Sequence, residues 1–277
     1  MAEITAAMVK AFREKTGLPM MECKKALVEA QGDQDKAIEL LRKAGKKTME
    51  KRSGRDTEAG RIVIYTAPNG TTAMIEVLCE TAPVANNGEF IALCEGMAKQ
   101  LAEGPGAATP EELLAQNFPG KNETIQTVFD DLVNKIREVF KFKRILRTDA
   151  KVGSYVHHDN ATGVVLELEG ENAELASNIC MHIASMKPMA LSKEDISAEK
   201  IEKEREIAKE QTEKDPKNAG KPANILEKII EGKVHAALSE ICLVDQPFVM
   251  ESAKSVGQAA KDGGLELKKF HLWLLGK

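Results

Sequence analysis

The apolar residues among the first 45 positions recur at helical spacing in three short stripes. Each stripe ends at a glycine, and the three glycines are Gly17, Gly32 and Gly45. Pro19 suits the first turn of the second helix, and the Asp33 carboxylate can accept the free amides at the start of the third. The pattern therefore predicts a compact three-helix head over residues 1–45.

Residues 46–60 are basic and polar and have too few apolar side chains to bury a surface. This composition predicts a linker between the head and the rest of the chain. The lysines and arginines of the linker could touch phosphates. Since no aromatic residues are interleaved with them, a solvated tether is the favoured interpretation.

The rest of the chain repeats one order of elements. Alternating apolar residues flank a turn at Ala67–Gly70 and another at His158–Gly163, so each region predicts a β-hairpin. A helical stripe follows each hairpin, from Phe90 to Leu101 and from Leu175 to Met186. The economical interpretation is an α+β fold whose body is two similar lobes with antiparallel sheets. The predicted lobes are residues 61–150 and 151–277.

Three further elements complete this prediction. An apolar stripe from Ile125 to Phe140 predicts one long helix in the first lobe. At about residues 193–241, a capping box at Ser192–Asp195 and a highly charged helix precede a break and a second helix with nearly coiled-coil spacing. This pair predicts a protruding antiparallel helical arm. Alternation from Leu265 to Leu275 predicts a last strand that completes the second sheet.

Composition narrows the class of protein. The chain has 277 residues, of which 43% are hydrophobic, 30% charged and 4% aromatic. So few aromatic residues argue against a stacking platform for single-stranded nucleic acid, and we expect no direct nucleic-acid partner. No apolar run approaches about 20 residues, and no signal-peptide pattern is found, so we expect no membrane contact. Five scattered cysteines without a C-x-x-C pair fit a reducing, cytoplasmic location.

Catalytic chemistry has little support in the sequence. His157, His158 and Asp159 suggest a metal site, but neighbouring strand residues point to opposite faces and no third ligand stands at a fixed spacing. Phosphate-binding glycine loops and a nucleophile elbow are both missing. A hydrolase using a cysteine and a histidine stays an alternative, although no spacing positions such a pair. We expect no cofactor and no enzyme activity.

The second predicted helix carries the strongest candidate for a binding surface. Met20 stands three residues before Cys23 and is expected in the core stripe, whereas Met21 and Val28 fall on an outer face near Lys24. An exposed methionine beside lysines suits an adaptable contact with an acidic, apolar groove. The alternative is that both methionines fill the head's core.

Several motifs resemble those of the bacterial elongation factor Ts family, in the family's order and near its spacing. They are the segment 13–27, Gly153–Tyr155 with His157, Met181–Pro188, Gln246–Glu251 and Val256–Gln258. The resemblance implies a guanine nucleotide exchange factor that binds elongation factor Tu, both GDP-bound and nucleotide-free, during translation elongation. The predicted three-helix head by itself is similar to a ubiquitin-associated domain. A ubiquitin-like binder that works through the head alone is a further alternative.

The resemblance also implies which residues meet the partner. Arg13, Met20, Met21 and Lys24 match head positions that contact a helix of elongation factor Tu, and His157 matches a position in the second-lobe interface. The head and first lobe are expected on the partner's nucleotide-binding domain, and the second lobe on a β-barrel domain.

One segment departs from the family pattern. The family's Thr-Asp-Phe-Val, whose Asp and Phe intrude near the partner's magnesium and phosphate site, corresponds to Thr81, Ala82, Pro83 and Val84 here. Alanine has no carboxylate and proline has no aromatic ring, so either the partner's pocket has changed correspondingly or other contacts displace the nucleotide. The alternative is a Tu-binding homologue whose exchange activity is weakened at this segment.

Overall fold

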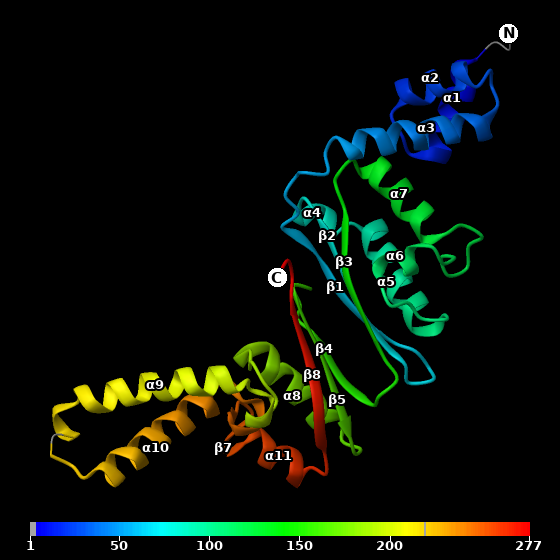
Figure 1. Ribbon diagram of the computed structural model, residues 1–277. Coiled ribbons are helices and arrows are strands. Elements are labelled where there is room, and N and C mark those ends of the chain that lie inside the picture. The colour runs from blue at the N-terminus through cyan, green and yellow to red at the C-terminus, as the bar shows by residue number, and fades with distance from the viewer. Residues whose placement is uncertain (1–3, 219) are drawn as a thin grey trace. The chain divides into compact units, whose positions relative to one another are not determined.

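The computed structural model describes residues 4–218 and 220–277, which form an α+β protein with small antiparallel sheets and an N-terminal helical head (Figure 1). The chain divides into two compact units. The first contains the described residues up to Asp149 together with His158–Ala161 and Leu274–Lys277. The second contains the described residues of Ala150–His157 and Thr162–Trp273.

The head consists of α1 (Ala6–Thr16), α2 (Met20–Glu29) and α3 (Gln34–Glu50), so the three predicted helices are confirmed. Gly17 ends α1 with a left-handed φ of 69°. The Asp33 carboxylate accepts the backbone N–H groups of Asp35 and Lys36 at 3.1 Å, which is the expected N-cap contact. The buried core of the head is Val9, Phe12, Cys23, Ala26, Leu27, Ala30, Ala37 and Leu41.

The predicted end of the third helix at Gly45 is wrong, because α3 continues to Glu50. A Cβ atom at Gly45 would lie 1.9 Å from Oδ1 of Asn134, so the glycine lets another helix cross α3 closely. The linker prediction for residues 46–60 is wrong in its first part for the same reason. The basic side chains that follow α3 are not all solvated either, since Arg52 donates to the Arg137 carbonyl at 2.9 Å.

The first lobe has a sheet of β1 (Ala59–Thr66), β2 (Thr72–Cys79) and β3 (Lys141–Thr148), in the order β1-β2-β3 with antiparallel neighbours. Helix α5 (Gly88–Glu103) packs on β1 and β2, and α7 (Ile125–Ile136) packs on α5 (Figure 1). Two short helices, α4 (Ala82–Ala85) and α6 (Pro110–Leu114), complete the lobe. The first predicted hairpin and its helix are confirmed.

The long helix predicted up to Phe140 ends earlier, at Ile136. Arg137 takes a left-handed φ of 69°, which turns the chain out of α7. Phe140 nevertheless enters the same core, with its ring centroid 4.9 Å from that of Phe90. The apolar residues of the sequence extend past the end of α7 because Val139 and Phe140, in the connecting segment, are buried as well.

The second lobe has a sheet in the order β4-β5-β8, formed by β4 (Val152–Val156), β5 (Thr162–Glu169) and β8 (Glu266–Leu274). Helix α8 (Ala173–Met186) packs on β4 and β5. The second hairpin, its helix and the last strand are therefore confirmed. Smaller elements close the lobe: η3 (Leu243–Asp245), β6 (Pro247–Phe248), β7 (Glu251–Ser255) and α11 (Val256–Asp262).

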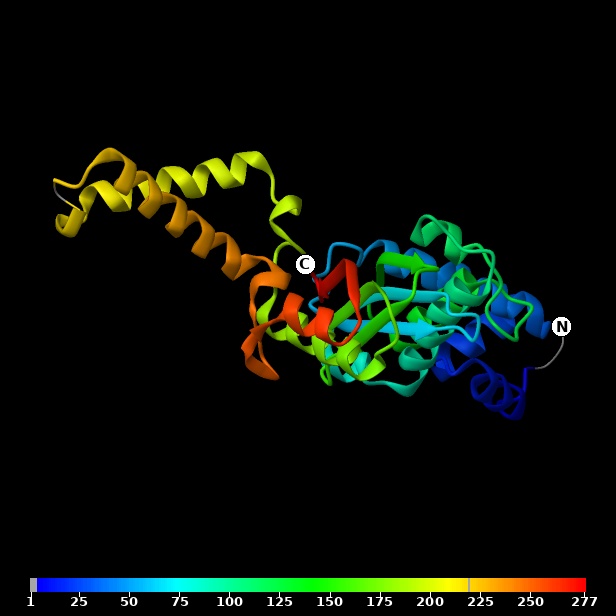
Figure 2. The same ribbon diagram turned by 90° about the horizontal axis from the view of Figure 1, so that it is seen from below.

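The predicted arm consists of α9 (Ala198–Lys214) and α10 (Ala223–Ile241), which pack along each other (Figures 1 and 2). The capping box at Ser192 exists, but it begins the short 3-10 turn η1 (Lys193–Asp195), and α9 starts after it. Another 3-10 turn, η2 (Pro216–Asn218), lies between the arm helices. There, the Asn218 amide donates to the Thr212 carbonyl at 3.0 Å.

The C-terminal residues close a buried polar cluster in the first unit. Glu76, at the centre of β2, is fully buried and pairs with Arg144 of β3. Its other carboxylate oxygen accepts the backbone N–H of Gly276 at 2.7 Å. The strand β2 and the tail Leu274–Lys277 are therefore joined by a buried charge.

All five cysteines are free and buried. Burial raises the pKa of Cys79 to about 11 and that of Cys180 to about 12. None of the helices in the described part of the chain combines the length and apolar character needed to cross a membrane.

Candidate functional site

The outer face of α2 exposes two methionines beside a lysine. The exposed fractions of Met21 and Val28 are 63% and 56%, so the predicted outer face is confirmed. Met20 was expected in the core, but 44% of it is exposed. It is the first residue of α2, so no preceding helical turn covers it, and Leu18 packs against the head's core instead. Exposed apolar side chains of this size are typical of a contact surface.

Arg13 on α1 and Lys24 on α2 are also exposed. The four head residues therefore combine apolar area with positive charge on neighbouring helices. This chemistry suits an acidic, apolar groove.

The segment Thr81–Val84 is on the surface of the first lobe, directly after β2. Thr81, Ala82 and Pro83 are exposed and Val84 is half-buried. Thr81 is the N-cap of α4, which begins with Ala82 and Pro83. A proline in the first turn of a helix suits this backbone, because its missing N–H would have no partner inside the helix.

Two glutamates hold the base of this segment. The Glu138 carboxylate accepts the Thr81 backbone N–H at 3.1 Å and the Thr81 hydroxyl at 2.7 Å. Glu80 accepts the Val139 backbone N–H at 2.8 Å and pairs with Arg55 at 3.1 Å. These contacts, led by the hydrogen bond from Val139, lower the pKa of the Glu80 carboxyl.

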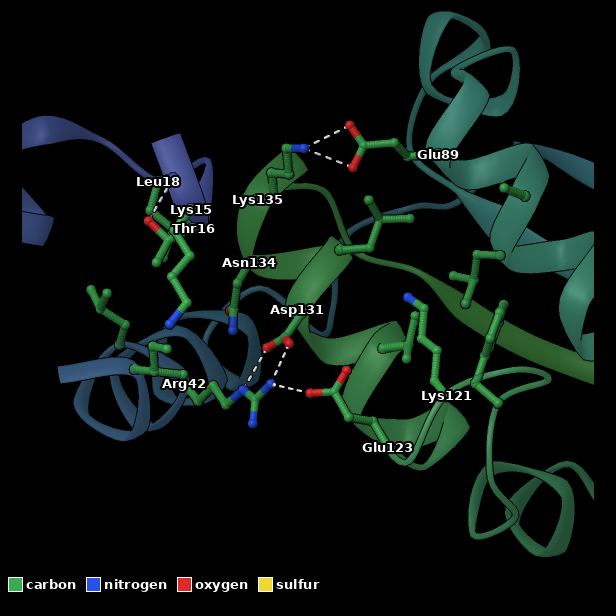
Figure 3. A pocket seen from close by; sticks show the side chains of 17 residues that line it. Lys15, Thr16, Leu18, Arg42, Glu89, Lys121, Glu123, Asp131, Asn134 and Lys135 are labelled. Carbon is green, nitrogen blue, oxygen red and sulfur yellow. Dashed lines mark hydrogen bonds and ion pairs between the residues drawn. The ribbon is translucent and has the colours of Figure 1, made fainter. Parts of the chain in front are cut away.

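Charged pairs join the head to the first lobe within the first unit. Arg42 of α3 donates from Nε to Asp131 of α7 at 2.8 Å and pairs with Glu123 at 3.1 Å, and both partners raise its pKa (Figure 3). On α2, Glu22 forms an ion pair with Arg137. The exposed head residues Arg13, Met20, Met21 and Lys24 and the segment Thr81–Val84 therefore belong to one compact unit.

A cavity of about 690 Å³ lies between the head and α7. Its apolar lining includes Leu18, Leu41 and Leu132, and the charged side chains Arg42 and Lys135 are paired with carboxylates around it (Figure 3). Pairing of this kind supports the junction between the helices.

His157 lies in the second unit, directly after β4. It is half-buried, and its Nδ1 is 2.9 Å from the Tyr155 hydroxyl. The structure thus brings together the predicted residues of the head and first lobe in one unit, with His157 in the other. Within the described residues, no group of three His, Cys, Asp or Glu side chains could hold a metal ion, so the metal interpretation of His157–Asp159 gains no support.

The hydrolase alternative requires a cysteine on the surface, and the structure has none among the described residues. Every cysteine is buried, and burial raises the pKa of the Cys94 and Cys180 thiols, which keeps them protonated at neutral pH. Sequence reasoning missed Glu138 and Arg137, which contact Thr81 and Glu22. No local pattern marks these contacts, because their partners are far away in the sequence.

Comparisons with known proteins give one family. Residues 80–277 match the family model described as Elongation factor TS. Elongation factor Ts of Azoarcus sp. (strain BH72) is 43% identical over 281 residues, which cover 100% of this chain and 92% of the relative. Elongation factor Ts of Thioalkalivibrio sulfidiphilus (strain HL-EbGR7) is 39% identical over 278 residues, which cover 99% of this chain and 92% of the relative. The similarity thus extends over practically the whole chain.

Proposed function

Because the chain belongs to the elongation factor Ts family, we propose that it is a guanine nucleotide exchange factor that binds elongation factor Tu and promotes GDP release during translation elongation. The observation that carries the proposal is the presence of two exposed contact segments in one compact unit. One is the methionine face of α2, and the other is Thr81–Val84. We place this activity in the cytoplasm.

The proposed mechanism is free-energy coupling between two ligands of elongation factor Tu. A protein that binds the nucleotide-free form more tightly than the GDP-bound form weakens GDP binding by the same factor. Each 1.4 kcal/mol of that preference corresponds to about a tenfold change in affinity. No covalent step is needed, so the protein acts as a binding factor for both forms of its partner and needs no cofactor.

In this proposal the head docks through Arg13, Met20, Met21 and Lys24 on a helix of the partner. Methionine side chains adapt to the surface they meet, and the two cations favour an acidic surface. Thr81–Val84 approaches the nucleotide site, and His157 contributes to the contact of the second lobe.

A second function has a specific observation in its favour. The exposed pair Ala82–Pro83 offers neither a carboxylate nor an aromatic ring at the start of α4. A chain that docks without reaching the magnesium and phosphate region would bind elongation factor Tu and accelerate GDP release only weakly.

The test is stopped-flow release of a fluorescent GDP analogue from the cognate elongation factor Tu. We expect the unmodified chain to accelerate release strongly, and the Ala82→Asp/Pro83→Phe variant to bind with similar affinity. Binding without acceleration, restored by the double substitution, would replace the exchange factor with the Tu-binding homologue. Absence of any binding would reject both functions.

A further inference from the structure

Two segments at one end of the first sheet exchange hydrogen bonds through their side chains. The paired residues of β2 and β3 end at Leu78 and Lys141. Beyond this point the Glu138 carboxylate accepts the N–H of Thr81, and the Glu80 carboxylate accepts the N–H of Val139. Glutamate carboxylates thus continue the contact between the two segments where the backbone pairing stops.

The contact at Thr81 has two points. One Glu138 oxygen accepts the Thr81 N–H at 3.1 Å, and the other accepts the Thr81 hydroxyl at 2.7 Å. Two bonds from one planar group restrict orientation as well as position. Thr81 directly precedes the exposed pair Ala82–Pro83, so this contact determines where the surface segment begins.

The residue before Glu138 connects to the head. Arg137 forms an ion pair with Glu22, which stands on α2 between Met21 and Lys24. The Arg137 carbonyl accepts a hydrogen bond from Arg52 at 2.9 Å. The φ of 69° at Arg137 is disfavoured for residues with a Cβ atom, so these surrounding contacts maintain an unusual backbone conformation.

We propose that the connector Arg137–Val139 positions the segment Thr81–Val84 relative to the contact face of the head, with Glu138 as the positioning residue. This inference rests on the proposed exchange function. Exchange would depend on Glu138, although Glu138 does not touch the partner's nucleotide. A segment held in place spends no binding free energy on becoming ordered, so more of that free energy can act on the GDP site.

The experiment compares Glu138→Ala with Glu138→Gln in the full chain. Alanine removes both contacts with Thr81. Glutamine keeps the shape, since its Oε1 can accept the Thr81 N–H while its Nε2 donates to the Thr81 hydroxyl. Glu95→Ala is the matched control, because it removes an exposed glutamate of α5 that makes no ion pair among the described residues.

GDP release from elongation factor Tu is measured over a range of factor concentrations. We expect Glu138→Ala to lower the maximal release rate about tenfold, which corresponds to 1.4 kcal/mol. The half-saturating concentration should change little, because the docking face of the head is intact. Glu138→Gln and Glu95→Ala should remain near the unmodified chain. An unchanged maximal rate in Glu138→Ala, or an equal loss in the glutamine variant, would overturn the positioning role.

Hydrogen–deuterium exchange of the free protein separates this inference from the exchange function. Peptides that cover residues 80–86 should exchange faster in Glu138→Ala than in Glu138→Gln, since Thr81 loses its acceptor. This readout needs no partner, so it still decides whether Glu138 holds the segment if the unmodified chain fails to release GDP. Equal exchange in the two variants would contradict the proposal.

Discussion

At the residue scale, two glycines within helices have different roles. Gly45 in α3 lies against the buried Asn134 of α7, and a Cβ atom there would meet Oδ1 at 1.9 Å. Gly232 in α10 has open space around the position of its missing Cβ. The first glycine permits a close crossing of helices, whereas the second only adds conformational freedom to the unfolded chain.

Alanine substitutions at these two positions should therefore change stability in opposite directions. We expect Gly45→Ala to lower the free energy of unfolding by about 1–3 kcal/mol, because the helices must separate. Gly232→Ala, the matched control, should raise it by about 0.5–1 kcal/mol through better helix propensity. Urea denaturation followed by circular dichroism measures both. Destabilisation of similar size by the two substitutions would refute this explanation of Gly45.

Gly45 and the two methionines of α2 show which features of the head could be predicted from the sequence. The spacing of apolar residues predicts α3, but it does not predict that α3 continues past Gly45. The reason for a glycine there is close contact with Asn134, which is distant in the sequence. Met21 could be placed on the outer face from the helical period alone. Met20 could not, because its exposure depends on where α2 begins and on Leu18 taking the core position.

At the scale of elements, α2 presents the proposed contact face, and the connector Arg137–Val139 contacts α2 through the ion pair of Arg137 with Glu22. The face could be predicted because a single helix fixes its geometry. The role of Glu138 could not be predicted, since the pairing of β2 with β3 brings it to Thr81. The prediction extended α7 to Phe140 because a buried connecting segment has apolar residues like those on the buried face of a helix.

Removal of the side chains on the α2 face should weaken association with elongation factor Tu. We expect Met21→Ala/Lys24→Ala to raise the dissociation constant about tenfold, since burial of a methionine side chain contributes about 1.5–3 kcal/mol. Ile207→Ala removes an apolar side chain of α9 that is 40% exposed and should leave affinity unchanged. Isothermal titration calorimetry measures both. Unchanged affinity in the head variant would remove the docking role of this face.

A buried histidine connects α8 to the segment that follows η3. Since the Val249 N–H donates to Nδ1 of His182 at 3.3 Å, the hydrogen of the neutral ring is on Nε2, which donates to Gln246 at 2.9 Å. The neutral ring thus satisfies both partners. Burial lowers the pKa of His182, and burial also lowers that of His271 in β8.

Stability should therefore decrease in mild acid. A lowered folded pKa means that the unfolded chain binds protons more readily, so stability is complete above the ordinary histidine pKa of 6.5 and is lost as the pH falls from there through the folded pKa. We expect His182→Gln, which cannot titrate, to show a shallower loss between about pH 7.5 and about pH 5. Exposed His235→Gln is the control, and denaturation at each pH is the measurement. Identical slopes in the unmodified chain and His182→Gln would exclude His182 as the cause.

At the scale of the whole molecule, the C-terminal tail contacts the first sheet within the first unit. The tail Leu274–Lys277 reaches the buried Glu76 through the Gly276 N–H, and Arg144 also donates to the Leu274 carbonyl at 3.1 Å. The most N-terminal sheet therefore depends on residues at the end of the sequence. A hydrophobic pattern could not indicate this contact, because Glu76 is a charged residue in a fully buried strand.

Removal of Leu275–Lys277 should destabilise the first unit. Glu76 would lose the Gly276 N–H, and an unsatisfied buried charged group costs about 1–3 kcal/mol or more. The control Lys277→Ala keeps that donor and the Lys277 carbonyl that accepts from Lys143 at 3.0 Å, and it should have little effect. Hydrogen exchange along β2 measures the change locally. If the truncated chain and the control protected β2 equally, the tail would have no structural role.

Because all five thiols are buried, the rate at which each one is modified reports how often its own part of the protein opens. One cysteine lies in the head, two lie in the first lobe and two in the second, and all are buried. A thiol that must first reach water reacts with an alkylating reagent only as often as its surroundings open. Under brief labelling, the modification rates of Cys23, Cys94 and Cys180 therefore report separately how often the head and each lobe open, without any introduced probe.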